Sequence, residues 1–390
     1  MRAFASRPAA AKRSGVRVLF DAAARRPDAI RLEVGEPSFT TPQHIIDAAA
    51  EAAAHGYTRY GPNGGLTSLR ELLAEKIARV DGYSPSPQQV VVTPGGMNAL
   101  YSVYLALLEP GDQVLLPTPG FPNMDEMVRL LGGDPVFYEL RAEDGFLPDV
   151  DRLGGLVSDR TKVLFVNSPS NPTGAVFPAE VMHDLAGFAA RHDLWLLSDE
   201  VYDELVLDDD ASHTAAATCD DDGRVISVYS FSKVYAMTGW RVGYCVAPEP
   251  LAALLCKLQE PQVSCPSTIS QKAAEAALTG PRAPIEAMRA AYQLRRDRAW
   301  EVMRDVGLHG HRSRGTIYML VDIAAAGRPS MDFCLALLDS AGVSVSPGEV
   351  FGPAAERFVR ISLAAEVDLI EEGLRRISAA LASGLAAVGT

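Results

Sequence analysis

Short β-rich runs alternate with longer helical patterns from about residue 88, and this alternation constrains the fold more than any other feature. Several of the runs are nearly continuous Val, Leu and Ile, which is typical of strands buried on both faces. The pattern predicts an α/β fold whose mainly parallel seven-stranded sheet is covered by helices and binds ligands beyond the carboxyl ends of its strands. The candidate strands are 89–93, 113–117, 135–139, 162–167, 194–198, 225–229 and 241–246.

The two ends of the chain lack the regular strand–helix alternation of its centre. An amphipathic helix is expected at 16–24, a long charged helix at 284–306, a Gly-bounded strand at 315–323, a further strand at 357–362 and a last helix at 367–381. We therefore expect two domains. The large domain covers 43–284, and a smaller α+β domain is built from 1–42 and 285–390.

Composition excludes several classes of partner. A net charge of −13 and a pI near 5.1 oppose binding to nucleic acid or to an anionic membrane, because both need a positive field. No apolar run approaches the roughly 18 residues that span a bilayer. The five cysteines are odd in number and lack CxxC spacing, and the histidines do not cluster, so we expect free thiols in a reducing cytoplasm and no metal site. The Arg- and Ala-rich segment 1–26 can mimic an organellar transit peptide, but it runs without a spacer into structured sequence and is expected to belong to the fold.

Ser230, Ser232 and Lys233 directly follow the expected strand 225–229, and Arg241 comes eight residues after the lysine. Desolvation at the end of a buried strand favours the neutral, nucleophilic amine that Schiff-base chemistry requires. The hydroxyls and the guanidinium can donate hydrogen bonds to a phosphate. Taken alone, such a group also fits a solvated loop.

Gly95 and Gly96 stand between the strand 89–93 and a helical pattern. Glycines there let the backbone approach a phosphate, and a helix N-terminus offers free N–H groups and a favourable dipole. An ordinary strand-to-helix turn is the alternative for these two residues.

Two further strand ends carry polar groups. Asn171 follows the strand 162–167, while Asp199 leaves the strand 194–198 with Tyr202 three residues on. An aspartate at the end of an apolar strand stays ionised only beside a cation or strong donors. A protonated pyridine nitrogen is such a partner.

Four stretches, SFSKVYAMTGWRVGY, NSPSNPTG, SDEVYDEL and TPGGMNAL, resemble the fold type I enzymes that use pyridoxal 5′-phosphate (PLP). The resemblance is to the class I/II aminotransferases of the aspartate aminotransferase superfamily. It extends over nearly the whole chain, because VGEPSFTTP, YGPNGGLTSLR, PGEVFG and FVRIS also fit in order and spacing.

The resemblance implies a role for each residue. Lys233 would form the internal aldimine and move the proton between the substrate α-carbon and C4′ of the cofactor, and Asp199 would pair with the pyridine nitrogen. Asn171 and Tyr202 would hold the phenolic oxygen. The remaining implied contacts are phosphate binding by Ser230, Ser232, Arg241 and the backbone of Gly95, Gly96 and Met97, ring stacking by Phe121, and substrate carboxylate binding by Arg360 with backbone contact from Gly35.

Tyr60 resembles a tyrosine that relatives offer to the neighbouring subunit's phosphate, which implies a homodimer with shared active sites. Some relatives that accept dicarboxylic amino acids carry a lysine in place of Met97, so we expect no specificity for acidic amino acids. Arg312 or Arg314 could bind a carboxylate at the far end of a substrate side chain, although we expect both arginines to have a structural role.

We expect a ping-pong aminotransferase that moves an amino group from an L-amino acid to a 2-oxo acid. The same cofactor apparatus could instead direct the carbanion toward elimination, replacement, cyclisation or oxidation. A non-catalytic PLP-sensing domain of a transcription regulator is disfavoured, because it needs an added DNA-binding module and the net charge is −13.

Overall fold

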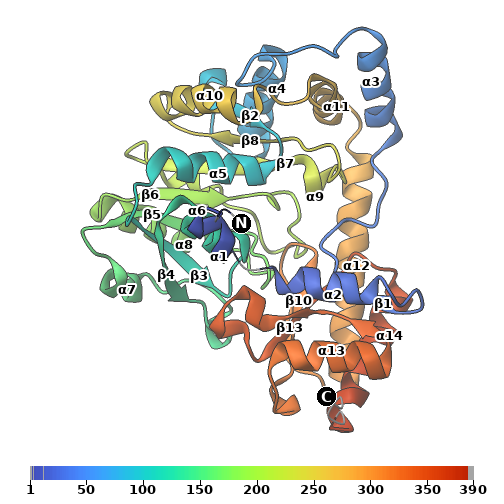
Figure 1. Ribbon diagram of the computed structural model, residues 1–390. Helices are drawn as coiled ribbons and strands as arrows, with labels where there is room; N and C mark the ends of the chain where they lie inside the picture. Colours follow the sequence, from blue (N-terminus) through green and yellow to red (C-terminus); the bar gives the residue numbers. More distant parts are fainter. Residues whose placement is uncertain (1, 3, 12, 385–390) are drawn as a thin grey trace.

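The computed structural model of the protein describes every residue except 1, 3, 12 and 385–390, which include parts of the expected small domain. Its largest sheet has seven strands in the order β2-β8-β7-β6-β5-β3-β4 (Figure 1). β8 runs in the direction opposite to the other six strands of this sheet, which are parallel to one another, and this confirms the mainly parallel α/β fold. The strands are β2 (Val90–Thr93), β3 (Gln113–Thr118), β4 (Asp134–Glu139), β5 (Thr161–Asn167), β6 (Trp195–Asp199), β7 (Val225–Ser230) and β8 (Gly243–Val246).

For the seven strands of this sheet, the expected bounds agree with the observed ones to within two residues. The largest difference is at β8, which was expected to begin at Arg241 and begins at Gly243. Arg241 adopts a left-handed backbone conformation with φ 54, so it belongs to the turn before the strand.

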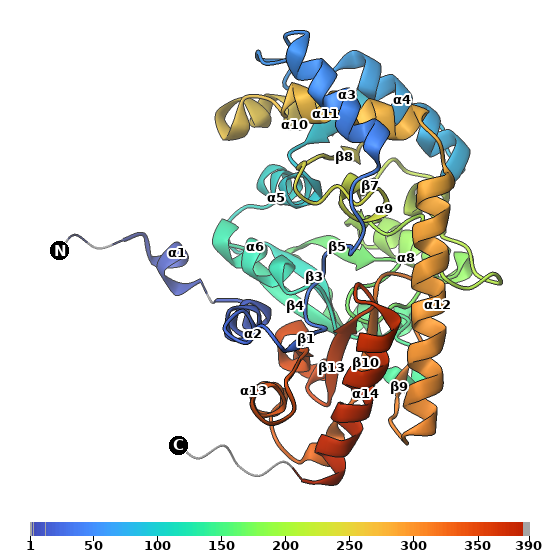
Figure 2. The ribbon, with the colours of Figure 1, turned by 90° about the vertical axis from the view of Figure 1, so that its right-hand side faces the viewer.

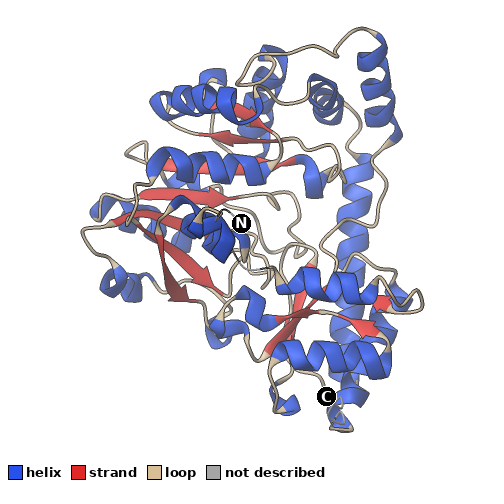
Figure 3. Cartoon of the chain, in the orientation of Figure 1, coloured by secondary structure: helices blue, strands red, loops and turns tan. Residues whose placement is uncertain are grey.

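Helices cover both faces of the seven-stranded sheet (Figure 3). Alternate residues of one strand face opposite layers. In β5, Val163 and Phe165 pack in the cluster formed with α5, α6 and α10, while Leu164 and Val166 pack in the cluster that includes α8. These four helices are α5 (Gly96–Leu107), α6 (Asn123–Leu131), α8 (Ala179–Arg191) and α10 (Glu249–Val263).

A four-stranded antiparallel sheet, ordered β12-β13-β10-β9, is built from the C-terminal part of the chain. Its strands are β9 (Gly310–His311), β10 (Tyr318–Asp322), β12 (Ser346–Pro347) and β13 (Phe358–Ser362). The N-terminal part joins this region, because β1 (Ile30–Arg31) pairs with β11 (Val343–Ser344). The exact division into domains at 43 and 284 stays a prediction.

The longest helix, α12 (Ala283–Asp305), runs from beside α11 past α14 (Figure 2). No helix in the described part of the chain is long and apolar enough to cross a membrane. The other α-helices are α1 (Ser6–Ala10), α2 (Gly15–Ala23), α3 (Gln43–Ala54), α4 (Thr67–Val80), α7 (Val150–Leu153), α9 (Phe231–Val234), α11 (Thr268–Thr279), α13 (Ser330–Ala341) and α14 (Val367–Ala382).

Gly243 lies where β8 passes directly against the turn before α5. A Cβ atom at this position would lie 2.7 Å from the carbonyl carbon of Gly95 and 2.9 Å from the carbonyl oxygen of Tyr229. We therefore expect Gly243→Ala to lower the free energy of unfolding by about 1–3 kcal/mol, as overpacking does. Thermal denaturation checks this. Gly239→Ala is the matched control, because its Cβ would have no atom within 4 Å, and equal melting temperatures for the two variants would contradict the packing described.

Candidate active site

A cavity of about 370 Å³ lies at the carboxyl ends of the parallel strands and borders the small antiparallel sheet. It contains Asn167 from the end of β5, Asp199 from the end of β6, Ser230 from the end of β7 and Arg360 from β13. Every residue to which the resemblance assigns a cofactor or substrate contact lines it, except Gly95 and Tyr60. The side chain of Tyr60 is 89% exposed and lies outside this cavity.

Lys233 is presented by the short helix α9, which begins as soon as β7 ends. Ser230 caps this helix, since its Oγ accepts a hydrogen bond from the backbone N–H of Ser232 at 3.1 Å. The cap fixes the direction of the first turn. The Nζ of Lys233 then reaches the cavity and donates to the carbonyl oxygen of Gly35, which comes from the N-terminal part of the chain.

Asp199 is a buried carboxylate with few partners. The residue is 4% exposed, and its carboxylate accepts a hydrogen bond from the backbone N–H of Val201 at a long 3.4 Å. Burial raises the pKa of Asp199 to about 7; the charge of Glu200 adds to this rise, and the Val201 N–H opposes it. A cation in the cavity would therefore stabilise the ionised carboxylate.

Arg360 brings a buried positive charge to the cavity from β13 of the small antiparallel sheet. Its Nη1 donates to Oδ1 of Asn171 at 2.9 Å, and its Nη2 donates to Oγ of Ser346 at 3.1 Å. The guanidinium lies 4.0 Å from the centre of the Tyr318 ring, while Nε is buried without a partner. A planar guanidinium with a remaining donor suits a carboxylate.

Tyr202 and Tyr318 form a pair of buried phenols, with 3.3 Å between their oxygens. Burial acts to raise the pKa of Tyr318, but the charges of Lys233 and Arg360 outweigh it and hold that pKa below its ordinary value. Tyr318 was not expected in the site, because it comes from β10, outside the seven-stranded sheet. The signal in the sequence that could have pointed to Tyr318 is its position in the strand expected at 315–323.

One end of the cavity is built for an anion. Gly96 and Met97 open α5, so backbone N–H groups at a helix N-terminus face the cavity. The hydroxyls of Ser230 and Ser232 lie 2.9 Å apart beside it. Gly95, with φ 82, sits against the guanidinium of Arg241, so a side chain at Gly95 would displace that group.

The rest of the lining is mainly apolar. Met97 and Phe121 were expected there, whereas Val16 from α2 and Phe351 were not. The charged residues that line the cavity, within the part of the chain described, are Asp199, Lys233, Arg241 and Arg360.

Arg312 and Arg314, considered as readers of a distal acid, lie outside the cavity. Arg312 donates to Asp208 at 2.9 Å, and Arg314 donates to Asp210 at 3.0 Å. These ion pairs fit the structural role expected for the two arginines.

Comparison with known proteins agrees with this geometry. The family model for aminotransferase class I and II matches residues 27–377. The chain is 39% identical to an aspartate aminotransferase of Pyrococcus abyssi, over 94% of this chain and 95% of the relative. It is 37% identical to aromatic-amino-acid aminotransferase 2 of Thermococcus litoralis, with the same coverage.

The solved structure of aspartate aminotransferase from Thermus thermophilus with maleate superimposes with a TM-score of 0.93 at 38% identity, covering 97% of this chain and 100% of that one. Sequence and structure thus agree over nearly the full length. The chain belongs to the class I and II aminotransferases.

Proposed function

We propose that this aminotransferase uses PLP bound to Lys233 and transfers the amino group of a neutral L-amino acid to a 2-oxo acid. The observation that carries the proposal is one cavity with a lysine amine, a poorly partnered buried carboxylate and an anion site at a helix N-terminus. These are the groups that an aldehyde, a pyridine nitrogen and a phosphate require.

The residues present fit this cofactor. Asp199 would receive the protonated pyridine nitrogen, which would supply the cation that its buried carboxylate lacks. Ser230, Ser232 and Arg241 would bind the phosphate together with the first turn of α5. When bound, PLP withdraws electrons from the substrate α-carbon.

Asn171, Tyr202 and Phe121 would complete the cofactor contacts. Oδ1 of Asn171 accepts from Arg360, so the other polar group of its amide is a donor, which suits the phenolic oxygen. Tyr202 offers its hydroxyl to the same oxygen, and the aromatic ring of Phe121 provides a stacking surface.

The chain's own groups account for the rest of the reaction. Arg360 would bind the substrate α-carboxylate, with backbone contact from Gly35, and thereby orient the α-carbon. Lys233 would accept the α-proton and return it at the neighbouring cofactor carbon, acting as general base and then general acid. The mainly apolar lining excludes water around these transfers.

The neutral substrate class follows from the side chains around the remaining space. The cavity has three cations, and each already has a proposed partner: the cofactor for Lys233, the phosphate for Arg241 and the substrate α-carboxylate for Arg360. At the start of α5 the lining residue is Met97, and the described lining residues include no further cation. A second substrate carboxylate would therefore be desolvated without a partner of opposite charge, which is unfavourable.

We further propose a cytoplasmic homodimer with shared active sites. The five cysteines are free thiols, as expected in a reducing compartment. Tyr60 is 89% exposed in the single chain, so it is available to the phosphate site of a second subunit.

Replacing Lys233 with Ala tests the proposed function directly. Wild-type protein incubated with PLP and borohydride should carry the reduced cofactor on the peptide containing Lys233, as detected by mass spectrometry. Lys233→Ala should carry none, and its turnover should fall by at least about a hundredfold, because a general base is lost. A Lys233→Ala variant that still forms a reducible adduct would contradict the assignment.

Met97→Lys tests the substrate class. A cation at this position should raise kcat/KM for aspartate at least about tenfold, because a hydrogen bond to a charged group contributes about 1.5–3 kcal/mol. It should lower kcat/KM for leucine and phenylalanine. Met97→Gln, which adds polarity without charge, is the control. Wild-type protein that already uses aspartate as efficiently as leucine and phenylalanine would contradict the neutral class.

A further inference from the structure

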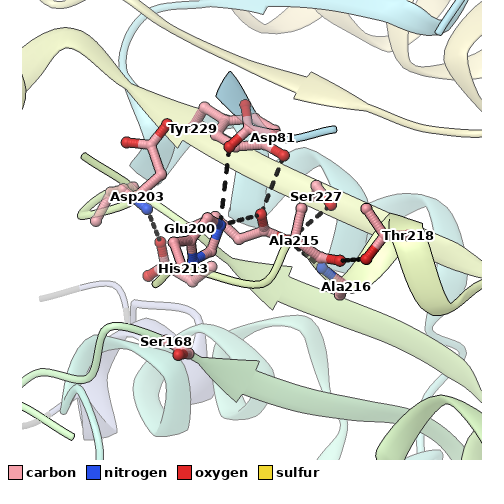
Figure 4. A network of polar contacts seen from close by, with 12 residues as sticks. Asp81, Ser168, Glu200, Asp203, His213, Ala215, Ala216, Thr218, Ser227 and Tyr229 are labelled. Atoms are coloured by element: carbon pink, nitrogen blue, oxygen red, sulfur yellow. Dashed lines mark hydrogen bonds and ion pairs between the residues drawn. The ribbon is translucent and has the colours of Figure 1, made fainter. Parts of the chain in front are cut away.

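A buried network of charged and polar side chains surrounds Glu200 (Figure 4), and Glu200, His213 and Asp81 do not line the cavity. Glu200 follows Asp199 directly and is 0% exposed. The backbone N–H of Glu200 donates to the carbonyl oxygen of Val228 at 2.8 Å and so continues the pairing of β6 with β7. Any movement of Glu200 would therefore move the end of the strand that holds Asp199.

The carboxylate of Glu200 links β6 to β7. It accepts hydrogen bonds from Oγ of Ser227 at 2.9 Å and from the hydroxyl of Tyr229 at 3.0 Å. Ser227 and Tyr229 are alternate residues of β7, so their side chains lie on the same face of the strand. Val228 and Ser230 lie on the other face, which packs against Gly96 at the start of α5. One buried carboxylate thus connects the strand end bearing Asp199 to the strand that leads into Ser230 and Lys233.

His213 supplies the counter-charge. Its Nε2 lies 2.9 Å from Oε2 of Glu200 and 3.8 Å from Oδ1 of Asp81. Burial acts to lower the pKa of His213, but the hydrogen bond and the charge of Glu200, with Asp203 and Asp81, outweigh it and raise that pKa. Burial acts to raise the pKa of Glu200, but the hydrogen bond and the charge of His213, with the hydrogen bond from Ser227, outweigh it and hold that pKa below its ordinary value.

Asp81, Glu200 and His213 lie close enough to hold a metal ion, with candidate ligand atoms within 4.8 Å of one another. Two contacts disfavour that use. Glu200 already accepts hydrogen bonds from four groups, and the ammonium of Lys76 donates to Asp81 at 2.9 Å. A second cation between these residues would meet the positive charge of Lys76.

We propose that Glu200 and His213 are positioning residues, whose ion pair holds the ends of β6 and β7 in register and so fixes Asp199 and the Ser230–Lys233 turn for the cofactor. This inference rests on the proposed function, because it takes the cavity as a PLP site. Neither residue lines the cavity, so both would act through Asp199 and β7.

Pyridoxine 5′-phosphate is the probe for this role. It has the ring and the phosphate of PLP but no aldehyde, so its binding reports on Asp199 and the phosphate site without bond formation to Lys233. Each protein is first freed of bound PLP with hydroxylamine. The dissociation constant of the probe is then measured by fluorescence titration for wild type, His213→Gln and the double variant Glu200→Gln/His213→Gln, well below the melting temperature of each protein.

His213→Gln should weaken binding of the probe about tenfold, because it leaves the Glu200 carboxylate buried without its counter-charge. The double variant should bind within about threefold of wild type, since the glutamine that replaces Glu200 needs no counter-charge and can still hydrogen-bond to β7. Such rescue by a second substitution is not expected from a loss of packing alone.

Leu185→Ala is the control for general destabilisation. Leu185 is fully buried in α8, takes no part in the hydrogen-bonded network and lies outside the cavity lining, so its truncation should lower the melting temperature without changing the dissociation constant. Should His213→Gln fail to fold, Ser227→Ala removes one β7 contact of Glu200 without burying an unpaired charge, and it should weaken binding about threefold.

Wild-type affinity in both His213→Gln and Ser227→Ala, or a double variant as weak as His213→Gln, would overturn the inference. Wild-type protein that does not bind the probe would overturn the proposed function and the inference together. Variants that shift probe binding as expected, in a protein that fails to transaminate, would leave the positioning role intact and refute only the proposed reaction.

Discussion

The site depends on a carboxylate that the fold buries without a matching charge. Asp199 ends a strand whose neighbours on both sides are parallel, so it cannot turn to solvent without breaking the sheet. Burial raises its pKa to about 7, and the hydrogen bond from Val201 to its carboxylate is long. A bound cation would lower that pKa, and the rest of the cavity supplies the groups that would hold a cofactor carrying one.

Two buried carboxylates with different partners lie at the carboxyl end of β6. The Asp199 carboxylate faces the cavity and lacks a counter-charge within the described part of the chain, whereas the Glu200 carboxylate faces inward and is paired with His213. Asp199 is therefore available to a ligand, whereas Glu200 stabilises the strands that carry the site. The last residue of β6 and the residue after it can serve both purposes, because the pairing with β7 continues through the N–H of Glu200 and successive side chains in such a pairing point to opposite faces.

Much of this arrangement was predictable from the sequence. Continuous apolar runs predicted the sheet, and parallel strands bring Asn171, Asp199 and Lys233 to one edge even though they are far apart in the chain. Tyr318, Val16 and Phe351 were missed because they enter the cavity from outside the seven-stranded sheet. Periodicity predicts the elements there but not how they pack against the sheet.

The central claim is that bound PLP receives the amino group of a neutral amino acid. The most direct measurement mixes purified PLP-loaded protein with one L-amino acid at a time, leucine, phenylalanine or aspartate, without any 2-oxo acid. The cofactor is then released and identified by mass spectrometry. Stoichiometric pyridoxamine 5′-phosphate and the matching 2-oxo acid from leucine or phenylalanine, with little from aspartate, is the predicted result. Unchanged PLP with every amino acid, or a substrate that is cleaved or cyclised instead, would contradict the account.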